Sequence, residues 1–144
     1  MKGMRKLSTE VKSSSVVGIV GIVTMVIGAL MMVTGATTWV MVGSQLKAEN
    51  IVVAEDAKWF AGKAVAGPLT AYSEADIINT HALDATGGKT YAELDREDPV
   101  RVVAMNASFL RASLFTSVLA YGVSLFALGV GLVFILLGYA VRKV

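Results

Sequence analysis

The chain has 144 residues, 55% of them hydrophobic and 17% charged, with a net charge of +2 and no cysteine. Soluble domains have about 45–50% apolar and about 25% charged residues, so this composition favours a membrane protein. Without cysteine, the chain can have no disulfide framework, iron–sulfur cluster, thiolate zinc site or lipoprotein anchor.

Charge is distributed unevenly along the chain. Residues 1–15 contain four bases and one acid, the C-terminal end carries Arg142 and Lys143, and the segment 43–107 has ten acids against six bases. Because basic residues beside a membrane span stay in the cytoplasm, we expect a plasma (inner) membrane protein with both termini cytoplasmic and the segment 43–107 extracytoplasmic. The lipid bilayer is a sufficient partner for the basic ends, so no nucleic acid is expected.

The N-terminal third of the chain predicts a tail followed by a membrane span. Residues 1–14 are polar and are expected to form a loose cytoplasmic tail. Residues 15–42 form an apolar run that exceeds the roughly 20 residues needed to cross a bilayer as a helix. This run is longer than the apolar region of a cleaved signal peptide, which has about 7–15 residues, so we expect transmembrane helix 1 to be retained.

Residues 43–98 are expected to form a small, mainly helical extracytoplasmic domain. A β-branched run begins at Ile51 and predicts a short strand or hairpin within residues 51–66. A surface helix is expected over residues 70–86, capped by Thr70 or Ser73. Its apolar face is rich in alanine, so the helix can pack closely while burying little area; the face consists of Ala71, Ala75, Ile78, Ala82 and Ala85.

The pair Asp98-Pro99 is typical of a helix start, with an acid at the cap and proline in the first turn. Neither glycine nor proline follows before Gly122, so we expect one continuous helix over residues 99–141 that includes transmembrane helix 2. Residues 142–144 form the cytoplasmic tail. The predicted fold class is an all-α membrane protein, an antiparallel two-helix transmembrane hairpin with a small, mainly helical extracytoplasmic cap.

Glycines recur at seven-residue spacings in both predicted spans. In lipid, small residues promote helix association because they let two backbones approach closely. Seven residues are nearly two helical turns, so each set lies along one face. The predicted helix-packing residues are Gly21, Gly28 and Gly35 in the first span and Gly122, Gly129, Gly131 and Gly138 in the second.

Two antiparallel registers are compatible with these glycines. In one register Gly28 faces Gly131, and in the other, shifted by two residues, Gly28 faces Gly129. The glycines fit either a tight hairpin within the chain or contacts with other membrane subunits or further copies of the chain. Both interpretations stay open on the sequence alone.

Three residues are candidates for contact with a partner, two at the expected outer interface and one, Tyr121, deeper in the lipid zone. Arg111 either snorkels to the headgroups or pairs with a carboxylate of the loop or of a partner. Tyr121 carries a hydroxyl towards the lipid and is expected either to bond across the hairpin to a threonine of residues 34–38 or to contact a partner or a quinone. Trp39 lies near the outer end of the first span, where aromatic rings favour the interface.

The sequence predicts no catalytic, cofactor-binding or metal-binding residues. His81 is the only histidine, which is too few for a zinc or non-haem iron site, and we interpret it as a surface or interface residue. The acids of residues 93–98 match no calcium-loop pattern and are interpreted as a solvated turn and helix cap. Four methionines share no single face and are interpreted as lipid-facing: Met25, Met31, Met32 and Met41.

The loop and the second span resemble a family of small two-span membrane proteins of actinobacteria. The resemblance is carried by four stretches, residues 44–51, 75–83, 87–99 and 108–117, which with the spans around them cover about half of the chain. The family has no assigned function and often bears an automatic label of aromatic ring-opening dioxygenase. One histidine and no cysteine cannot supply the iron site that this label requires.

These features predict a non-catalytic accessory or scaffold subunit of a multi-subunit cell-envelope membrane complex, of respiratory or transport type. The alternative is a homo-oligomeric envelope protein whose extracytoplasmic loop binds a ligand or cell-wall component. A third hypothesis, a membrane enzyme, would use the loop carboxylates Glu93, Asp95 and Asp98. Copurification with other subunits would favour the first hypothesis, and self-association with nothing else bound would favour the second. The third would need a measurable turnover that is lost when these acids are changed.

Overall fold

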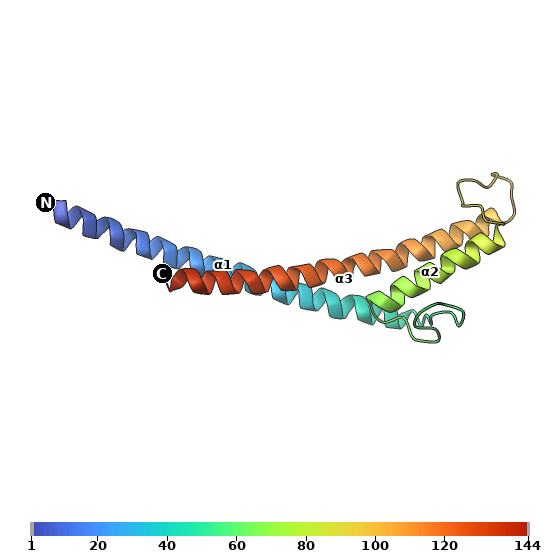
Figure 1. The fold of residues 1–144 in the computed structure, drawn as a ribbon, viewed down its shortest axis with the longest axis horizontal. Helices are drawn as coiled ribbons and strands as arrows, with labels where there is room; N and C mark the ends of the chain where they lie inside the picture. Colours follow the sequence, from blue (N-terminus) through green and yellow to red (C-terminus); the bar gives the residue numbers. More distant parts are fainter. Residues whose placement is uncertain (1, 144) are drawn as a thin grey trace. The chain divides into compact units, whose positions relative to one another are not determined.

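The computed structural model describes the backbone of residues 2–143 and the side chains of residues 15–143. Three helices account for most of it: α1 (Lys2–Ala48), α2 (Pro68–Ala85) and α3 (Arg101–Arg142) (Figure 1). The described residues contain no strand, only an isolated antiparallel bridge between Val52 and Ala64. The predicted all-helical class is therefore confirmed. Met1 and Val144, the outermost residues of the two expected tails, lie outside the described residues.

Two of the helices are long and apolar enough to cross a bilayer. They are the segment Ser15–Ala48 of α1 and the whole of α3, Arg101–Arg142. Few of their apolar side chains are buried, so neither resembles the core helix of a soluble protein. Helix α1 is longer than the expected span, because it begins at Lys2 rather than after a loose tail and continues past residue 42 to Ala48.

The two other helix starts differ from the sequence expectation. Helix α2 begins at Pro68, and Gly67 before it is extended, at φ −160° and ψ 177°. The hydroxyl of Thr70 accepts hydrogen bonds from the backbone N–H groups of Ala66 and Gly67, at 3.1 and 3.2 Å. Thr70 thus lies inside the first turn and anchors the chain before it, so the predicted cap at Thr70 or Ser73 is wrong.

Asp98 binds the chain at the start of α3, as predicted, but the helix begins two residues later than expected. A carboxylate oxygen of Asp98 accepts a hydrogen bond from the Val100 N–H at 3.0 Å. The helix then begins at Arg101. Such a side-chain acceptor satisfies one of the N–H groups that a helix start leaves without a partner.

The chain divides into two compact units. The first comprises Met1–Thr37 and Val123–Val144, and the second comprises Thr38–Gly122. In the second unit, α2 lies beside the first half of α3 (Figure 1). The core of this unit is formed by seven buried residues: Leu46, Val53, Val65, Ala71, Ala75, Leu114 and Tyr121.

The segment between α1 and α2 folds back on itself over that core. The Val53 N–H donates to the Lys63 carbonyl at 2.9 Å, and the Val65 N–H donates to the Ile51 carbonyl at 2.8 Å. These bonds join the two arms of the segment, and Val53 and Val65 are each only 1% exposed. Short β-branched arms bury one face while their backbone groups satisfy each other.

Candidate functional site

In the first unit, α1 and α3 contact each other through glycines. A Cβ atom added at Gly28 would lie 2.5 Å from the Gly131 carbonyl oxygen, and one added at Gly131 would lie 2.6 Å from the Gly28 carbonyl oxygen. The hydrogen that replaces Cβ in each glycine therefore points at the carbonyl of the other helix. Cα–H···O contacts of this kind recur where helices approach closely. Any side chain at these positions would force the backbones apart.

The same contact repeats along the two helices. A Cβ atom at Gly21 would lie 2.7 Å from the Gly138 carbonyl, and one at Gly35 would lie 2.7 Å from the Ser124 carbonyl. Residue numbers rise along α1 as they fall along α3, so the two segments run antiparallel within this unit. Of the two registers that the sequence left open, the structure has the one in which Gly28 faces Gly131.

Two of the seven glycines that were predicted to pack lie elsewhere. Gly122 and Gly129 have no atom within 4 Å of an added Cβ position. They therefore lie on open surface, and a larger side chain at either position would not collide with any described part of the chain. Whatever packing they provide would involve another molecule.

Two methionines lie on the helix contact rather than away from it. The Cγ atom of Met32 lies against Gly131, and the Cγ atom of Met25 lies against Gly138. Both side chains are partly buried. The interpretation of these two as lipid-facing is wrong. Unbranched methionine side chains fill the space that glycine leaves on the facing helix.

The rest of the surface of both helices is strongly apolar. Valine, isoleucine, leucine and phenylalanine side chains stand exposed all along the two segments, including Ile19, Leu30, Val33, Leu125 and Phe126. Soluble monomers rarely expose contiguous apolar patches larger than a few hundred Å². A surface of this kind is compatible with lipid or with apolar helices of another protein.

In the second unit, three parts of the chain meet at Tyr121. Its hydroxyl donates a hydrogen bond to the Ala66 carbonyl at 3.2 Å. Its ring contacts the Trp39 ring edge to face, with 4.7 Å between centroids. A Cβ atom at Gly43 would lie 3.0 Å from the Tyr121 hydroxyl, so glycine leaves room for this bond. The expected bond from Tyr121 to a threonine is wrong, since the acceptor lies in the segment before α2.

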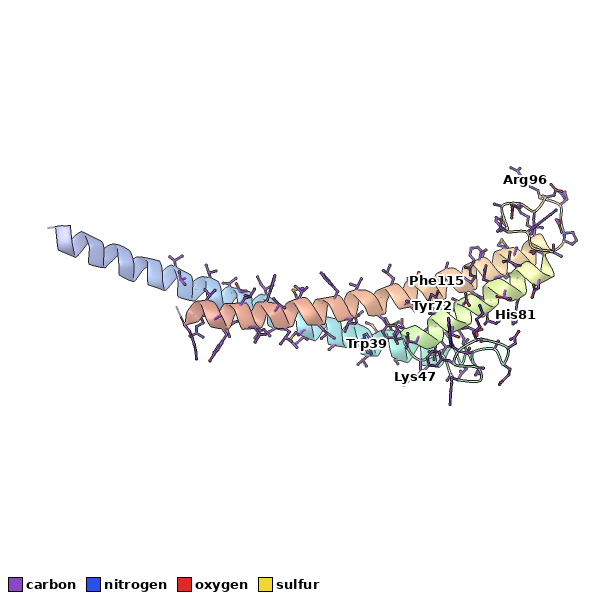
Figure 2. The ribbon with its side chains drawn as sticks, viewed as in Figure 1. Trp39, Lys47, Tyr72, His81, Arg96 and Phe115 are labelled. Carbon is purple, nitrogen blue, oxygen red and sulfur yellow. The ribbon has the colours of Figure 1, made fainter. Side chains whose placement is uncertain are left out.

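Arg111 contacts α2 rather than an acid. Its Nε donates to the Ala75 carbonyl at 3.3 Å, and its guanidinium lies 5.7 Å from the centroid of the Phe115 ring. The Phe115 ring in turn meets Tyr72 of α2, with 5.9 Å between centroids (Figure 2). Within the described residues Arg111 has no carboxylate partner. The sequence suggested an acid as the partner of Arg111. The actual acceptor could not be predicted, because every residue type has a backbone carbonyl.

The single histidine joins α2 to the folded segment before it. The His81 Nε2 atom lies 2.7 Å from a carboxylate oxygen of Asp56, and both side chains are exposed. Figure 2 shows the position of His81. The hydrogen bond from His81 is the main cause that lowers the pKa of Asp56 below 3.8, and desolvation acts in the opposite direction. Sequence reasoning placed His81 on the surface but found no partner for it, because Asp56 is 25 residues away in the chain.

Several carboxylates of the second unit accept hydrogen bonds from backbone groups. Glu74 is almost fully buried and accepts a hydrogen bond from the Ala54 N–H at 3.0 Å. Glu93 accepts from the N–H and the hydroxyl of Thr90, at 2.8 and 2.7 Å, and the backbone bond is the main cause of its lowered pKa. In the part of the chain that the structure describes, no three histidine, aspartate or glutamate side chains converge as a metal site would require.

A groove of about 440 Å³ runs between the end of α1 and α3 in the second unit. Its sides carry the polar side chains of Gln45, Glu49, Ser113 and Ser117, together with Leu110. The buried residues Leu46 and Leu114 form part of its lining. The groove thus offers an apolar floor between polar edges, which is a usual character for a site that receives another chain.

Comparison with known proteins identified no relative. The chain matches no family model, no curated protein and no solved structure.

Proposed function

We propose that the chain is a two-span protein of the plasma (inner) membrane that acts as a non-catalytic accessory or scaffold subunit of a larger cell-envelope complex, of respiratory or transport type. In this proposal α1 and α3 form an antiparallel transmembrane hairpin, both termini are cytoplasmic, and the segment 43–107 is extracytoplasmic and contributes a small cap. The resemblance of the loop sequence further supports membership of the small two-span actinobacterial proteins.

The exposed apolar surface of the two long helices supports the membrane assignment. Each helix exceeds the roughly 20 residues that span a bilayer core. The glycine contacts of Gly28 with Gly131 bring the backbones together, which is how helices associate where lipid replaces water. The basic residues Arg142 and Lys143 at the end of α3 support a cytoplasmic C-terminus.

One observation carries the subunit role. The folded second unit leaves a group of large apolar side chains exposed on α3, beside the groove: Val102, Val103, Phe109 and Leu110. An apolar patch next to a groove with polar edges is characteristic of a protein interface, and aromatic residues such as Phe109 often anchor one. A partner subunit that covered this patch would account for it.

The use of the polar side chains supports a structural role rather than catalysis. Glu93 and Asp98, which a carboxylate enzyme would need, instead accept hydrogen bonds from Thr90 and from the Val100 N–H. Asp56 and His81 bind each other. These bonds shape turns and helix starts, as capping side chains do.

The test is to extract the tagged protein from its native membrane in mild detergent and to identify the retained proteins by mass spectrometry. We expect a fixed set of larger membrane subunits at constant stoichiometry. Phe109→Asn should weaken their retention, whereas Leu69→Asn should not, since Leu69 of α2 is equally exposed (66% against 65%) but lies off the patch. Recovery of self-copies alone would contradict the proposal and favour the homo-oligomeric alternative. Recovery of a lone monomer would contradict both.

A further inference from the structure

A small cavity of about 50 Å³ lies between α2, α3 and the segment Lys89–Tyr91 in the second unit. It exists because the facing helices present small side chains there, Ala82 on α2 and Ala104 and Ala107 on α3. One water needs about 10–15 Å³ of such space, so the cavity has room for a few waters or for one carboxylate or phosphate group.

Two basic side chains line this cavity, Lys89 and Arg111, and none of the lining residues is acidic. Neither base forms an ion pair with any residue that the structure describes. Arg111 donates from Nε to the Ala75 carbonyl, which leaves the two terminal amino groups of its guanidinium for another acceptor. A third base, Arg101, lies with its guanidinium 4.0 Å from the centroid of the Tyr91 ring, and Tyr91 is itself part of the lining.

Glu93, an acid four residues after Lys89 in the chain, already has hydrogen-bond partners. Lys89 is among the causes of the lowered pKa of Glu93, although it is the last of them. The Glu93 carboxylate, however, accepts two hydrogen bonds from Thr90 and is not part of the lining. The cavity therefore keeps a positive balance, with the neutral hydrogen-bonding side chains of Asn79 and Tyr91 beside the two bases.

We propose that this cavity binds an oxyanion, a carboxylate or phosphate group that is either free or the end of a larger molecule. An arginine with free terminal amino groups can hold two oxygens of such a group at once, and a lysine adds a point charge. Lys89 and Tyr91 are exposed, so they mark the mouth through which the anion enters. This site is separate from the apolar patch and does not depend on a partner subunit.

The test uses the full-length protein in nanodiscs of zwitterionic lipid, titrated with inorganic phosphate, and separately with acetate, at constant ionic strength. Binding is followed by the amide NMR signals of Thr90 and Tyr91. We expect saturable shifts, with affinity at least tenfold weaker in Lys89→Gln and in Arg111→Gln. Lys63→Gln, which removes an exposed lysine outside the cavity, should bind as the unmodified protein does.

A cavity-filling variant tests whether binding needs the space in the cavity as well as the charge of the two bases. Ala107→Leu keeps both bases but occupies the cavity, so it should also abolish saturable binding. Lys89→Gln carries the test if Arg111→Gln fails to fold, because Lys89 is exposed and makes no hydrogen bond through its side chain to the described residues. Absence of saturable shifts, or equal affinity in Lys89→Gln, would overturn the proposal.

A second set of nanodiscs that contain phosphatidylglycerol distinguishes the sources of the anion. If a lipid headgroup fills the cavity, the Thr90 and Tyr91 signals should be shifted before phosphate is added, and Lys89→Gln should remove that shift. If the ligand is a free anion, the signals should match those in zwitterionic lipid until phosphate is added.

Discussion

The hydroxyl of Tyr121 donates a hydrogen bond to the carbonyl oxygen of Ala66, 55 residues earlier in the chain, at 3.2 Å. Through this bond α3 holds the segment that leads into α2, while the Trp39 ring brings α1 to the same point. Tyr121 is 2% exposed, so the bond is protected from water. Tyr121 therefore links α1, α3 and the segment that leads into α2 at one point.

Removal of that hydroxyl should destabilise the second unit. Tyr121→Phe keeps the ring but loses a buried hydrogen bond, which we expect to cost about 0.5–1.5 kcal/mol in the free energy of unfolding. Gly43→Ala should act in the same direction, because its Cβ would lie 3.0 Å from the hydroxyl oxygen. Denaturant unfolding in detergent, followed by tryptophan fluorescence, measures both effects.

Tyr72→Phe is the matched control for that experiment. Tyr72 is 46% exposed, and its ring contact with Phe115 survives the loss of the hydroxyl. We expect its stability to stay within error of the unmodified protein. Equal unfolding curves for Tyr121→Phe and Tyr72→Phe would show that the bond to Ala66 contributes nothing.

Replacing a glycine by alanine should destabilise the protein where the glycine lies at the contact between α1 and α3, but not where it lies on the open surface. Gly28→Ala places a Cβ 2.5 Å from the Gly131 carbonyl, and we expect overpacking of this kind to cost about 1–3 kcal/mol. Gly129→Ala meets open space, and alanine favours a helix over glycine by about 0.5–1 kcal/mol, so it should be neutral or stabilising. Unfolding in mixed micelles of increasing sodium dodecyl sulfate content compares the two. Equal effects of the two substitutions would argue against the close contact at Gly28.

The pair of Asp56 and His81 predicts a local dependence on pH. The pKa of Asp56 is lowered in the folded protein, chiefly by the hydrogen bond from His81. A lowered carboxyl pKa contributes stability above the ordinary pKa of 3.8 and loses it as the pH falls through the lowered value. In an NMR titration of the Asp56 carboxyl, His81→Ala should raise the pKa back towards 3.8. An unchanged pKa in this variant would show that another group causes the shift.

The sequence predicted those parts of the fold that depend on local pattern. Two apolar runs longer than a bilayer needs became the two long helices, and Asp98 does hold the start of α3. The start of α2 was misplaced because Thr70 resembles a cap residue by type, yet its hydroxyl bonds to Ala66 and Gly67 from within the first turn. Residue type alone does not distinguish these two uses of threonine.

Contacts between distant residues were harder to predict. The acceptors for Tyr121 and Arg111 are the backbone carbonyls of Ala66 and Ala75, which any residue type could supply. The glycine spacing did limit the helix register to two possibilities, but the spacing fits both equally well. Met32 was misread for a related reason, since its role comes from the space left by Gly131 on the other helix.

The central claim is a two-span membrane topology with the segment 43–107 outside the cytoplasm, and it has a direct test because the chain contains no cysteine. Single cysteines at Lys58, in the second unit, and at Lys143, beyond the end of α3, would be treated in intact cells with a membrane-impermeant maleimide. We predict that Lys58→Cys is labelled at once and that Lys143→Cys is labelled only after the membrane is permeabilised. Labelling of Lys143→Cys in intact cells, or protection of Lys58→Cys, would contradict the proposed topology.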